Sequence, residues 1–399
     1  MTFVKIKTIL LFKNMFDFDK VVDRVGTANV KWDLREKIFR NADVLPMWVA
    51  DMDFETPDCI VKAVQERAAH HIYGYTFFED KYFESFINWV KRRHQWEIEK
   101  DWIVFSPGIV TAANAAVLAY SEKGDGVIVQ PPVYFPFFDS ISRNGRKQLN
   151  NQLIYLDQTY QIDFEDLSNK AKEAKLILLS SPHNPVSRCW TKEEMLRLGE
   201  ICLENEVIII SDEIHADLIL PGFKHIPLAS LSDELAEVTV TCMAPSKTFN
   251  VAGFFTSQII IKNVKLRNRF KKVMESLHLI HGNIFGMVAS EAGYAHGDKW
   301  LDEMMTYVQG NFDLVQNFFE KELPVLQLSK AEATYLAWID FSKTGLSNKK
   351  IKDKLVNDAG LGLSPGSIFG AGGSGFMRMN LGTPQKNVIE ALEKLKATF

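Results

Sequence analysis

The spacing of apolar residues changes along the chain. Between about residue 101 and residue 261, short runs of Val, Ile and Leu alternate with longer segments whose apolar residues recur at helical spacing. The runs predict strands at 102–105, 126–130, 152–156, 176–180, 207–211, 238–243 and 257–261, and the longer segments predict helices at 109–120, 192–205 and 265–279. The central runs are almost continuously apolar, which is typical of parallel strands covered on both faces. This alternation predicts a wound α/β domain.

The flanking segments follow other patterns. Residues 57–96 predict two helices broken at Tyr73-Gly74-Tyr75, and the part after Gly282 mixes helical segments with strands near 335–340 and 376–381. We therefore divide the chain into a disordered or spurious extension followed by a start at Met15, an N-terminal arm that contributes to the small domain, a large domain and a small α+β domain. Their ranges are 1–14, 15–56, 57–284 and 285–399.

Composition and charge exclude several classes of protein. With 399 residues, 46% of them hydrophobic and 24% charged, the chain reads as a soluble globular protein. A net charge of -4 gives no general attraction to nucleic acid or to an anionic membrane, and no apolar run is long enough to span a membrane. The four cysteines form no C-x-x-C pair, and His278 and His281 have no acidic or cysteine neighbours, so no metal site is expected. We expect a cytoplasmic protein without disulfides.

Polar residues follow three of the predicted strands. Asn184 comes after 176–180, Asp212 after 207–211, and Lys247 after 238–243. Ligands of open α/β sheets bind at the carboxyl ends of the strands. An amine, a carboxylate and an amide gathered there suit pyridoxal 5'-phosphate, whose aldehyde forms a Schiff base with lysine and whose ring nitrogen pairs with an acid.

Each of these three residues also has an ordinary reading. Lys247 alone could be a surface lysine, although apolar surroundings would lower its pKa, as an amine nucleophile requires. Asp212 could cap a helix, but a run of β-branched residues precedes it, so it should be buried and must be paired or protonated. Asn184 could be a turn asparagine. Their joint occurrence at successive strand ends favours the functional reading.

Weaker candidates surround these three. Gly108, Ile109 and Val110 open a helix after a strand, where free backbone N–H groups can hold a phosphate. Ser246 could add a hydroxyl to the same phosphate, and Tyr134 could stack on a ring, although a structural aromatic is an equal alternative.

Two further candidates could equally be structural. Arg378 lies among apolar residues of a predicted strand, which suits bidentate capture of a carboxylate, but alone it reads as a surface arginine. His215 alone reads as a core histidine.

Taken together, these residues resemble those of pyridoxal-phosphate enzymes of fold type I, the aspartate aminotransferase superfamily. Within it the chain is most similar to the MalY/PatB group of C–S β-lyases, from Met15 onward. The matching stretches include Trp48-Val-Ala-Asp-Met-Asp-Phe54, Ser181-Pro-His-Asn-Pro185, Ser211-Asp-Glu-Ile-His-Ala-Asp217 and Ser246-Lys-Thr-Phe-Asn250. The resemblance implies a large domain with a mostly parallel seven-stranded sheet wrapped by helices, a smaller α+β domain and a homodimer.

The resemblance also implies roles for single residues. Lys247 would carry the cofactor, Asp212 would pair with the ring nitrogen, Asn184 would contact the ring hydroxyl, and Arg378 would bind the substrate carboxylate. The resemblance further implies that Tyr134 stacks on the ring, that His215 belongs to the cofactor-binding set, and that Gly108, Ile109, Val110 and Ser246 bind the phosphate, with Tyr75 reaching it across the dimer interface.

At two positions the chain resembles the lyases, which also have His and Phe there, and differs from many aminotransferases. These positions are His215 and Phe255, where many aminotransferases have Tyr and Arg. The implied activity is α,β-elimination from cystathionine or another cysteine S-conjugate, giving pyruvate, ammonia and a thiol. An aminotransferase and a regulatory protein that keeps the cofactor with little catalysis remain as alternatives. Ser187 and Ala333 stand where the group often has Gly. The sequence therefore does not identify which sulfur amino acid is the substrate.

Overall fold

The computed structural model describes residues 15–399, so the expectation for residues 1–14 lies outside the described part. A seven-stranded sheet forms its centre, in the order β2-β10-β9-β8-β7-β3-β4. Its strands are β2 (Ile103–Ser106), β3 (Gly126–Val129), β4 (Lys147–Asn150), β7 (Ala174–Ser180), β8 (Ile208–Asp212), β9 (Thr239–Met243) and β10 (Ser257–Ile260). The five strands from β9 to β4 are parallel, while β10 runs antiparallel to both β2 and β9. The α/β fold class is confirmed.

One predicted strand lies elsewhere. The run at 152–156 was expected in the main sheet, but β5 (Ile154–Leu156) pairs with β6 (Thr159–Gln161) in a separate antiparallel hairpin. The seventh strand is β4 at the sheet edge, where three of four side chains are exposed. An edge strand of this kind has no continuous apolar run, so the sequence pattern indicates the neighbouring, more apolar segment 152–156 instead.

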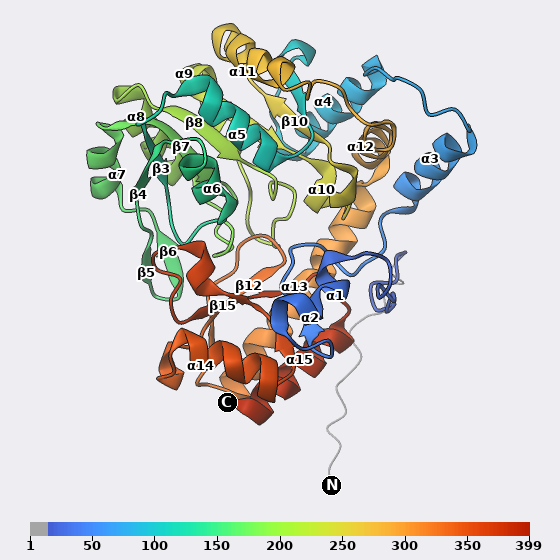
Figure 1. Cartoon of the computed structure of the whole chain (residues 1–399), viewed down its shortest axis with the longest axis vertical. Coiled ribbons are helices and arrows are strands. Elements are labelled where there is room, and N and C mark those ends of the chain that lie inside the picture. Colours follow the sequence, from blue (N-terminus) through green and yellow to red (C-terminus); the bar gives the residue numbers. More distant parts are fainter. Residues whose placement is uncertain (1–14) are drawn as a thin grey trace.

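Helices cover both faces of this sheet (Figure 1). On one face, α5 (Ile109–Tyr120), α6 (Pro136–Ser142) and α11 (Val264–Ser276) pack on Val127 and Val129. On the other, α7 (Phe164–Ala171), α8 (Lys192–Glu204) and α9 (Asp233–Val238) pack on Ile128 and Ile177. Because side chains of a strand alternate between the faces, strands with two covered faces must be apolar at nearly every position.

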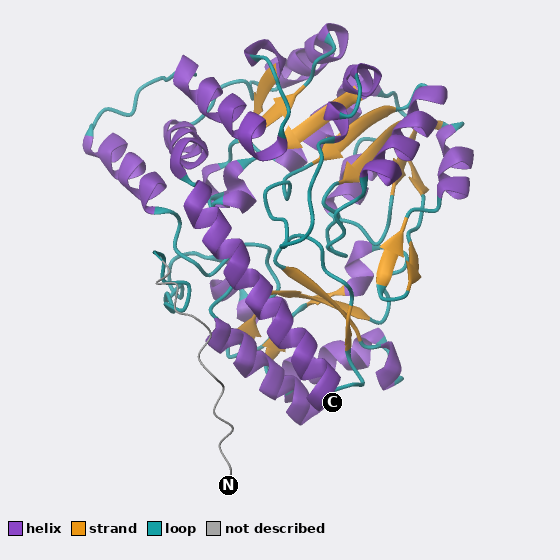
Figure 2. Ribbon diagram, turned by 180° about the vertical axis from the view of Figure 1, so that it is seen from behind, coloured by secondary structure: helices purple, strands orange, loops and turns teal. Residues whose placement is uncertain are grey.

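A second group of helices lies beside the sheet. The two helices predicted in 57–96 are α3 (Asp58–Ala69) and α4 (Asp80–His94), and both pack against α12 (Ile284–His296). Between α3 and α4, residues 70–79 form neither helix nor strand. The 25-residue helix α13 (Asp298–Glu322) then runs from this layer down to the C-terminal part of the chain (Figure 2).

The C-terminal part is built on a smaller sheet of β11 (Gln327–Leu328), β12 (Leu336–Asp340), β15 (Phe376–Asn380) and β14 (Ser364–Pro365). It carries α14 (Asn348–Asp353), a π-helical turn (Lys354–Asp358) and α15 (Gln385–Thr398). The N-terminal arm contains α1 (Val30–Asp33), α2 (Arg35–Phe39) and β1 (Leu45–Pro46), and β1 pairs with β13 (Leu361–Gly362). The arm is therefore attached to the C-terminal part, which brings its next residues over the carboxyl ends of the large sheet.

None of the helices described for residues 15–399 is both long and apolar enough to cross a membrane. Within the same residues, no three His, Cys, Asp or Glu side chains gather as a metal site requires.

Candidate active site

Three neighbouring parallel strands place Asn184, Asp212 and Lys247 at or just beyond their carboxyl ends, on one side of the sheet. Asp212 is the last residue of β8 and pairs in register with Ser180 of β7 and Cys242 of β9. Asn184 follows β7 by four residues, and Lys247 lies in the short helix α10 (Pro245–Thr248) directly after β9. Parallel strands end on the same side of a sheet, so the three side chains project into the same region.

Asp212 is a buried carboxylate with little compensation. Only 5% of it is exposed, and within residues 15–399 the one hydrogen bond to its side chain comes from the backbone N–H of Ile214, at 3.1 Å. Burial raises the pKa of Asp212 to about 7, although the Ile214 hydrogen bond and the nearby Lys247 amine work in the opposite direction. The carboxylate of Asp212 therefore keeps hydrogen-bonding capacity for one more cationic or N–H partner.

Lys247 is half-buried, and its Nζ donates a hydrogen bond to the carbonyl oxygen of Ala50 at 2.5 Å. Burial lowers the pKa of Lys247 to about 8, a shift that the carboxylate of Asp51 reduces and the guanidinium of Arg378 enlarges. A substantial fraction of the amine is therefore uncharged near neutral pH, which a nucleophile or base needs.

Arg378 reaches the same region from the smaller sheet, in β15. Its Nη1 donates to Asn184 Oδ1 at 2.9 Å and its Nη2 to the carbonyl of Trp48 at 2.8 Å, while Nε has no partner within the described residues. Only 5% of Arg378 is exposed, and no carboxylate of residues 15–399 pairs with it. Burial lowers the pKa of Arg378 to about 10, which leaves it charged at neutral pH. A buried, unpaired guanidinium of this kind is suited to binding a carboxylate.

Tyr134 and His215 lie close to these charged groups. Burial raises the pKa of Tyr134, and the charge of Asp212 adds to the shift. His215 is buried edge-on to Tyr335, with 6.4 Å between ring centroids, and its Nδ1 has no partner in the described chain. Burial lowers the pKa of His215 to about 3, so the imidazole is neutral at physiological pH.

The start of α5 is open. Gly108 occupies the N-cap position without a side-chain cap, and a Cβ added there would meet nothing within 4 Å. The first N–H groups of a helix lack partners inside the helix and carry a partial positive charge, so this end can take an anion. Ile109 is buried, Val110 is exposed, and Ser246 in α10 is partly buried.

Tyr75 stands apart from the other candidate residues. It lies in the connection between α3 and α4 and is fully exposed in the single chain. The structure of one chain therefore does not bring it to the other site residues.

The sequence reasoning missed the part of the arm that lies over the site. The carbonyl of Ala50 accepts hydrogen bonds from Lys247 and from the Tyr335 hydroxyl, the latter at 2.9 Å, and the carbonyl of Trp48 accepts one from Arg378. In the sequence, the stretch from Trp48 to Phe54 stands out only for its resemblance to the family. These contacts use backbone oxygens, which every residue carries, so no residue type could signal them.

One buried carboxylate, Asp217, supports the turn that carries Lys247. Asp217 accepts hydrogen bonds from Thr248 at 2.7 Å and Trp89 at 2.9 Å and pairs with His94 at 2.8 Å. Burial alone would raise the pKa of Asp217, but His94 and the hydrogen bonds hold it below its ordinary value. Because Thr248 follows Lys247, this network fixes the turn that carries the lysine.

The structure describes the surroundings of Ser187, which stands where the lyase group often has Gly, and of Phe255, which resembles the lyases. Ser187 has φ of 57°, the left-handed region that favours glycine, and its hydroxyl lies 2.8 Å from that of Thr334 and donates to the carbonyl of Leu336 at 2.6 Å. These hydrogen bonds offset the strain of a serine there. Phe255 is 66% exposed and donates no side-chain hydrogen bond, so it cannot replace an arginine as a phosphate ligand.

Comparison with known proteins places this geometry in a family. Residues 42–395 match the family described as "Aminotransferase class I and II". The chain is 45% identical over 385 residues to cystathionine beta-lyase PatB of Bacillus subtilis, covering 96% of this chain and all of that protein. It is 30% identical to protein MalY of Escherichia coli, covering 96% of this chain and 98% of that protein.

Two solved structures are also very similar. A PLP-bound putative aminotransferase from Clostridium difficile gives a TM-score of 0.95 at 41% identity, covering 96% of this chain and 99% of that one. Cystalysin from Treponema denticola, which contains pyridoxal 5'-phosphate, gives a TM-score of 0.93 at 38% identity, covering 96% of this chain and 98% of that one. The chain belongs to the class I and II aminotransferase family.

Proposed function

We propose that the protein is a pyridoxal-phosphate-dependent C–S β-lyase that cleaves cystathionine or another L-cysteine S-conjugate to pyruvate, ammonia and a thiol. The observation that carries the proposal is the convergence of Lys247, Asp212 and Arg378, three buried or half-buried charged groups without ion-pair partners among the described residues. The same residues would also suit an aminotransferase, and the names of PatB and cystalysin support the lyase.

The residues present fit the cofactor. Asp212 has one hydrogen-bond donor and a raised pKa, so a protonated ring nitrogen would supply the missing partner. Lys247 offers an amine with a depressed pKa, and the uncapped start of α5 at Gly108 offers N–H groups for a phosphate. We assign Tyr134 and Asn184 to the ring, and His215, Ile109, Val110 and Ser246 to the remaining cofactor contacts.

The side chains of this chain perform binding and proton transfer. Arg378 binds the α-carboxylate of the substrate and thereby fixes the direction of the Cα–H bond. Lys247 Nζ, as a neutral amine, takes the proton from Cα. When bound, the cofactor supplies an electron-withdrawing ring that stabilises the charge released at Cα. The thiolate then leaves from Cβ, and the remaining three-carbon unit is hydrolysed to pyruvate and ammonia.

An aminotransferase is the second candidate, because the family bears that description and one of the very similar solved structures is called a putative aminotransferase. Both reactions begin with loss of the Cα proton, and they differ in the fate of the charge left at Cα. His215 and Phe255 stand where many aminotransferases have Tyr and Arg, which supports the lyase.

We also propose that the protein is a homodimer in the cytoplasm. The connection between α3 and α4 exposes Ile72, Tyr73, Tyr75 and Phe77, each by more than half. Neighbouring apolar residues exposed in this way are typical of an interaction surface. A second copy seated here would bring Tyr75 to the phosphate of its partner's site. Free cysteines throughout the described chain support a reducing compartment.

Two parallel incubations of purified, cofactor-loaded protein test the function. Pyruvate and free thiol from cystathionine support the lyase, whereas glutamate from an amino acid plus 2-oxoglutarate supports the aminotransferase. The Lys247→Ala variant serves as the control for both and should form neither product. A protein that binds the cofactor but yields no product from a broad panel of amino acids would instead be a regulatory protein.

A further inference from the structure

The arm residues that cover the site have no secondary structure of their own. Between β1 and α3 the chain forms neither helix nor strand. Backbone hydrogen bonds tie its ends, from Met47 N–H to Gly362 and from Asp53 N–H to Gly382. The residues between these ends carry the carbonyls that accept hydrogen bonds from Arg378 and Lys247. Their position therefore depends on side chains that hold the segment.

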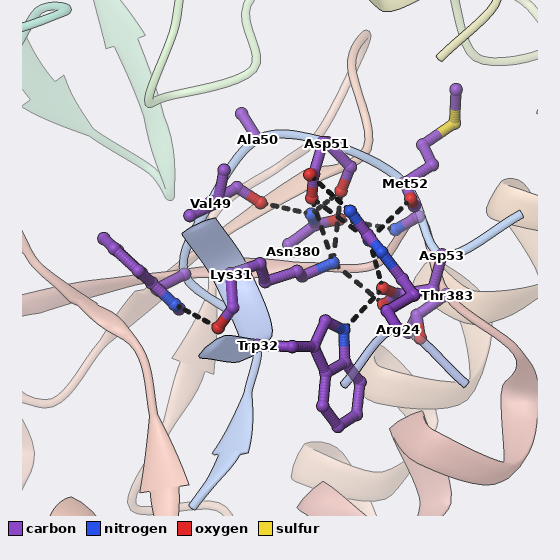
Figure 3. Close-up of polar contacts among 12 residues, drawn as sticks. Arg24, Lys31, Trp32, Val49, Ala50, Asp51, Met52, Asp53, Asn380 and Thr383 are labelled. Atoms are coloured by element: carbon purple, nitrogen blue, oxygen red, sulfur yellow. Dashed lines mark hydrogen bonds and ion pairs between the residues drawn. The ribbon is translucent and has the colours of Figure 1, made fainter. Parts of the chain in front are cut away.

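Lys31 contacts this segment at both of its ends, and Figure 3 shows the contacts of its ammonium group with Asp51 and Asp53. Its ammonium group donates to the carbonyl of Asp51 at 3.1 Å and to Asp53 Oδ2 at 2.8 Å. Its own backbone carbonyl accepts the indole N–H of Trp48 at 3.1 Å. Only 1% of Lys31 is exposed, which is rare for a lysine and requires this kind of pairing.

Arg24 and Trp32 complete a closed cluster around Asp53. Arg24 Nη1 donates to Asp53 Oδ1 at 2.6 Å and Trp32 Nε1 donates to the same oxygen at 3.1 Å, while Arg24 Nη2 pairs with Asp51 at 2.6 Å. Burial alone would raise the pKa of Asp53, but Lys31 and Arg24 hold it below its ordinary value. Buried ion pairs add little net stability, because desolvation offsets attraction, and their clearest use is to select one arrangement.

The other side of the segment is tied to the site itself. Asn250, three residues after Lys247, accepts a hydrogen bond from Met52 N–H at 2.9 Å and donates to the carbonyls of Met52 and Phe54. Asn380, two residues after Arg378, donates to the carbonyls of Val49 and Asp51. The segment is thus placed between the Lys31 cluster and the two elements that carry Lys247 and Arg378, α10 and β15.

We propose that Lys31 is a positioning residue that clamps the segment from Trp48 to Asp53, so that the carbonyls of Trp48 and Ala50 meet Arg378 and Lys247, and thereby sets the affinity for amino-acid substrates. This inference rests on the proposed binding of an amino-acid carboxylate by Arg378. Without the clamp, the carbonyl that orients the Arg378 guanidinium becomes mobile, and the guanidinium is no longer held ready for the carboxylate.

The test compares Lys31→Met, which keeps an unbranched side chain that is one atom shorter and removes its charge and donors, with Lys20→Met. Lys20 is a matched control because it forms an exposed ion pair with Glu55 in the same arm, at 2.6 Å. Hydrogen exchange of an arm peptide covering residues 45–54 reports on the clamp, in cofactor-free and cofactor-loaded protein. The KM and kcat for cystathionine, and the calorimetric Kd of L-alanine, report on the site.

We expect Lys31→Met to speed exchange in the arm peptide but not in a β7 peptide, and to raise KM and Kd about tenfold while kcat changes less than about threefold. Lys20→Met should match the wild type in all of these. A clamp with a merely structural role would lower the melting temperature and leave KM and Kd of the folded enzyme within about twofold of wild type, which would overturn the proposal. Unchanged exchange in the arm would overturn it as well.

Trp48→Phe keeps an aromatic side chain, although a smaller one, and all charges of the cluster, but it removes the indole hydrogen bond to the backbone carbonyl of Lys31. It decides the question if Lys31→Met fails to fold, because a rise in KM and Kd is expected here too and its absence contradicts the proposal. The calorimetric Kd needs no turnover. A wild-type protein that binds L-alanine but forms no pyruvate would therefore refute the lyase function while still testing the clamp.

Discussion

Replacing Arg378 with lysine is the most informative single change in the substrate site. Arg378 uses two of its N–H groups on Asn184 and Trp48, and its Nε–H has no partner in the described chain. Nε and the remaining N–H groups of the fork can therefore meet both oxygens of a carboxylate in parallel. Lysine keeps the charge but offers a compact ammonium, which cannot reproduce two parallel hydrogen bonds.

The expected loss follows from these contacts. A hydrogen bond to a charged group contributes about 1.5–3 kcal/mol. Losing one of two such bonds, together with the fixed direction of the fork, should cost about 2–4 kcal/mol of transition-state stabilisation, which is a roughly 30- to 1000-fold fall in kcat/KM. The fall should appear mostly in KM, because the carboxylate is bound before and during the reaction.

The assay measures pyruvate released from cystathionine by Arg378→Lys, with Arg197→Lys as the control. Arg197 lies in α8 and stacks over Phe164 at 4.3 Å, on the sheet face covered by α7 to α9, so its replacement should leave kcat/KM unchanged. A kcat/KM for Arg378→Lys within about threefold of wild type would show that another group binds the carboxylate.

Three further predictions concern the charged groups and the assembly. In cofactor-free protein, the raised pKa of Asp212, about 7, means that its stabilising contribution is lost as pH rises from about 4 through 7. Asp212→Asn should therefore become more stable than wild type above pH 7. A difference in denaturation midpoint that does not depend on pH would contradict this prediction. The lowered pKa of Lys247, about 8, means that its charged form destabilises the fold below pH 8. Cofactor-free Lys247→Met should therefore be more stable than wild type at pH 7, and the difference in stability should shrink toward pH 10.5. A difference that grows with pH would contradict the prediction. Mixing inactive Lys247→Ala with weakly active Tyr75→Ala subunits should restore about a quarter of wild-type activity, because half of the dimers are mixed and each mixed dimer holds one intact site. No recovery of activity after subunit exchange would argue against a site shared between subunits.

The central strands were predictable because their burial leaves a strong pattern in the sequence. Val127 and Val129 face one helical layer and Ile128 faces the other, so no polar residue interrupts the run. The edge strand β4 carries no such constraint, since three of its four side chains are exposed, and the prediction placed a strand in the hairpin that follows it. Strand pairing at an edge is decided by backbone hydrogen bonds, which the residue types hardly record.

The residues that we propose for the cofactor could be predicted from the sequence for a related reason. Asp212 ends the apolar strand β8 and Lys247 lies four residues after the apolar strand β9, so the sequence indicates where both lie relative to the sheet. The arm could not be placed in this way, because its contacts with the site use carbonyl oxygens. Lys31 and Asp53 are 22 residues apart in irregular sequence, and nothing there distinguishes a buried lysine from an exposed one. The role that we propose for Tyr75 requires a second chain, which no single-chain pattern contains.

We propose that Lys247 carries the cofactor covalently before the substrate binds. Protein loaded with pyridoxal 5'-phosphate should be reduced with borohydride, digested and analysed by mass spectrometry. We predict loss of the absorption band near the visible edge and a stable cofactor adduct on the peptide that contains Lys247. No adduct, or one confined to other lysines, would contradict the account.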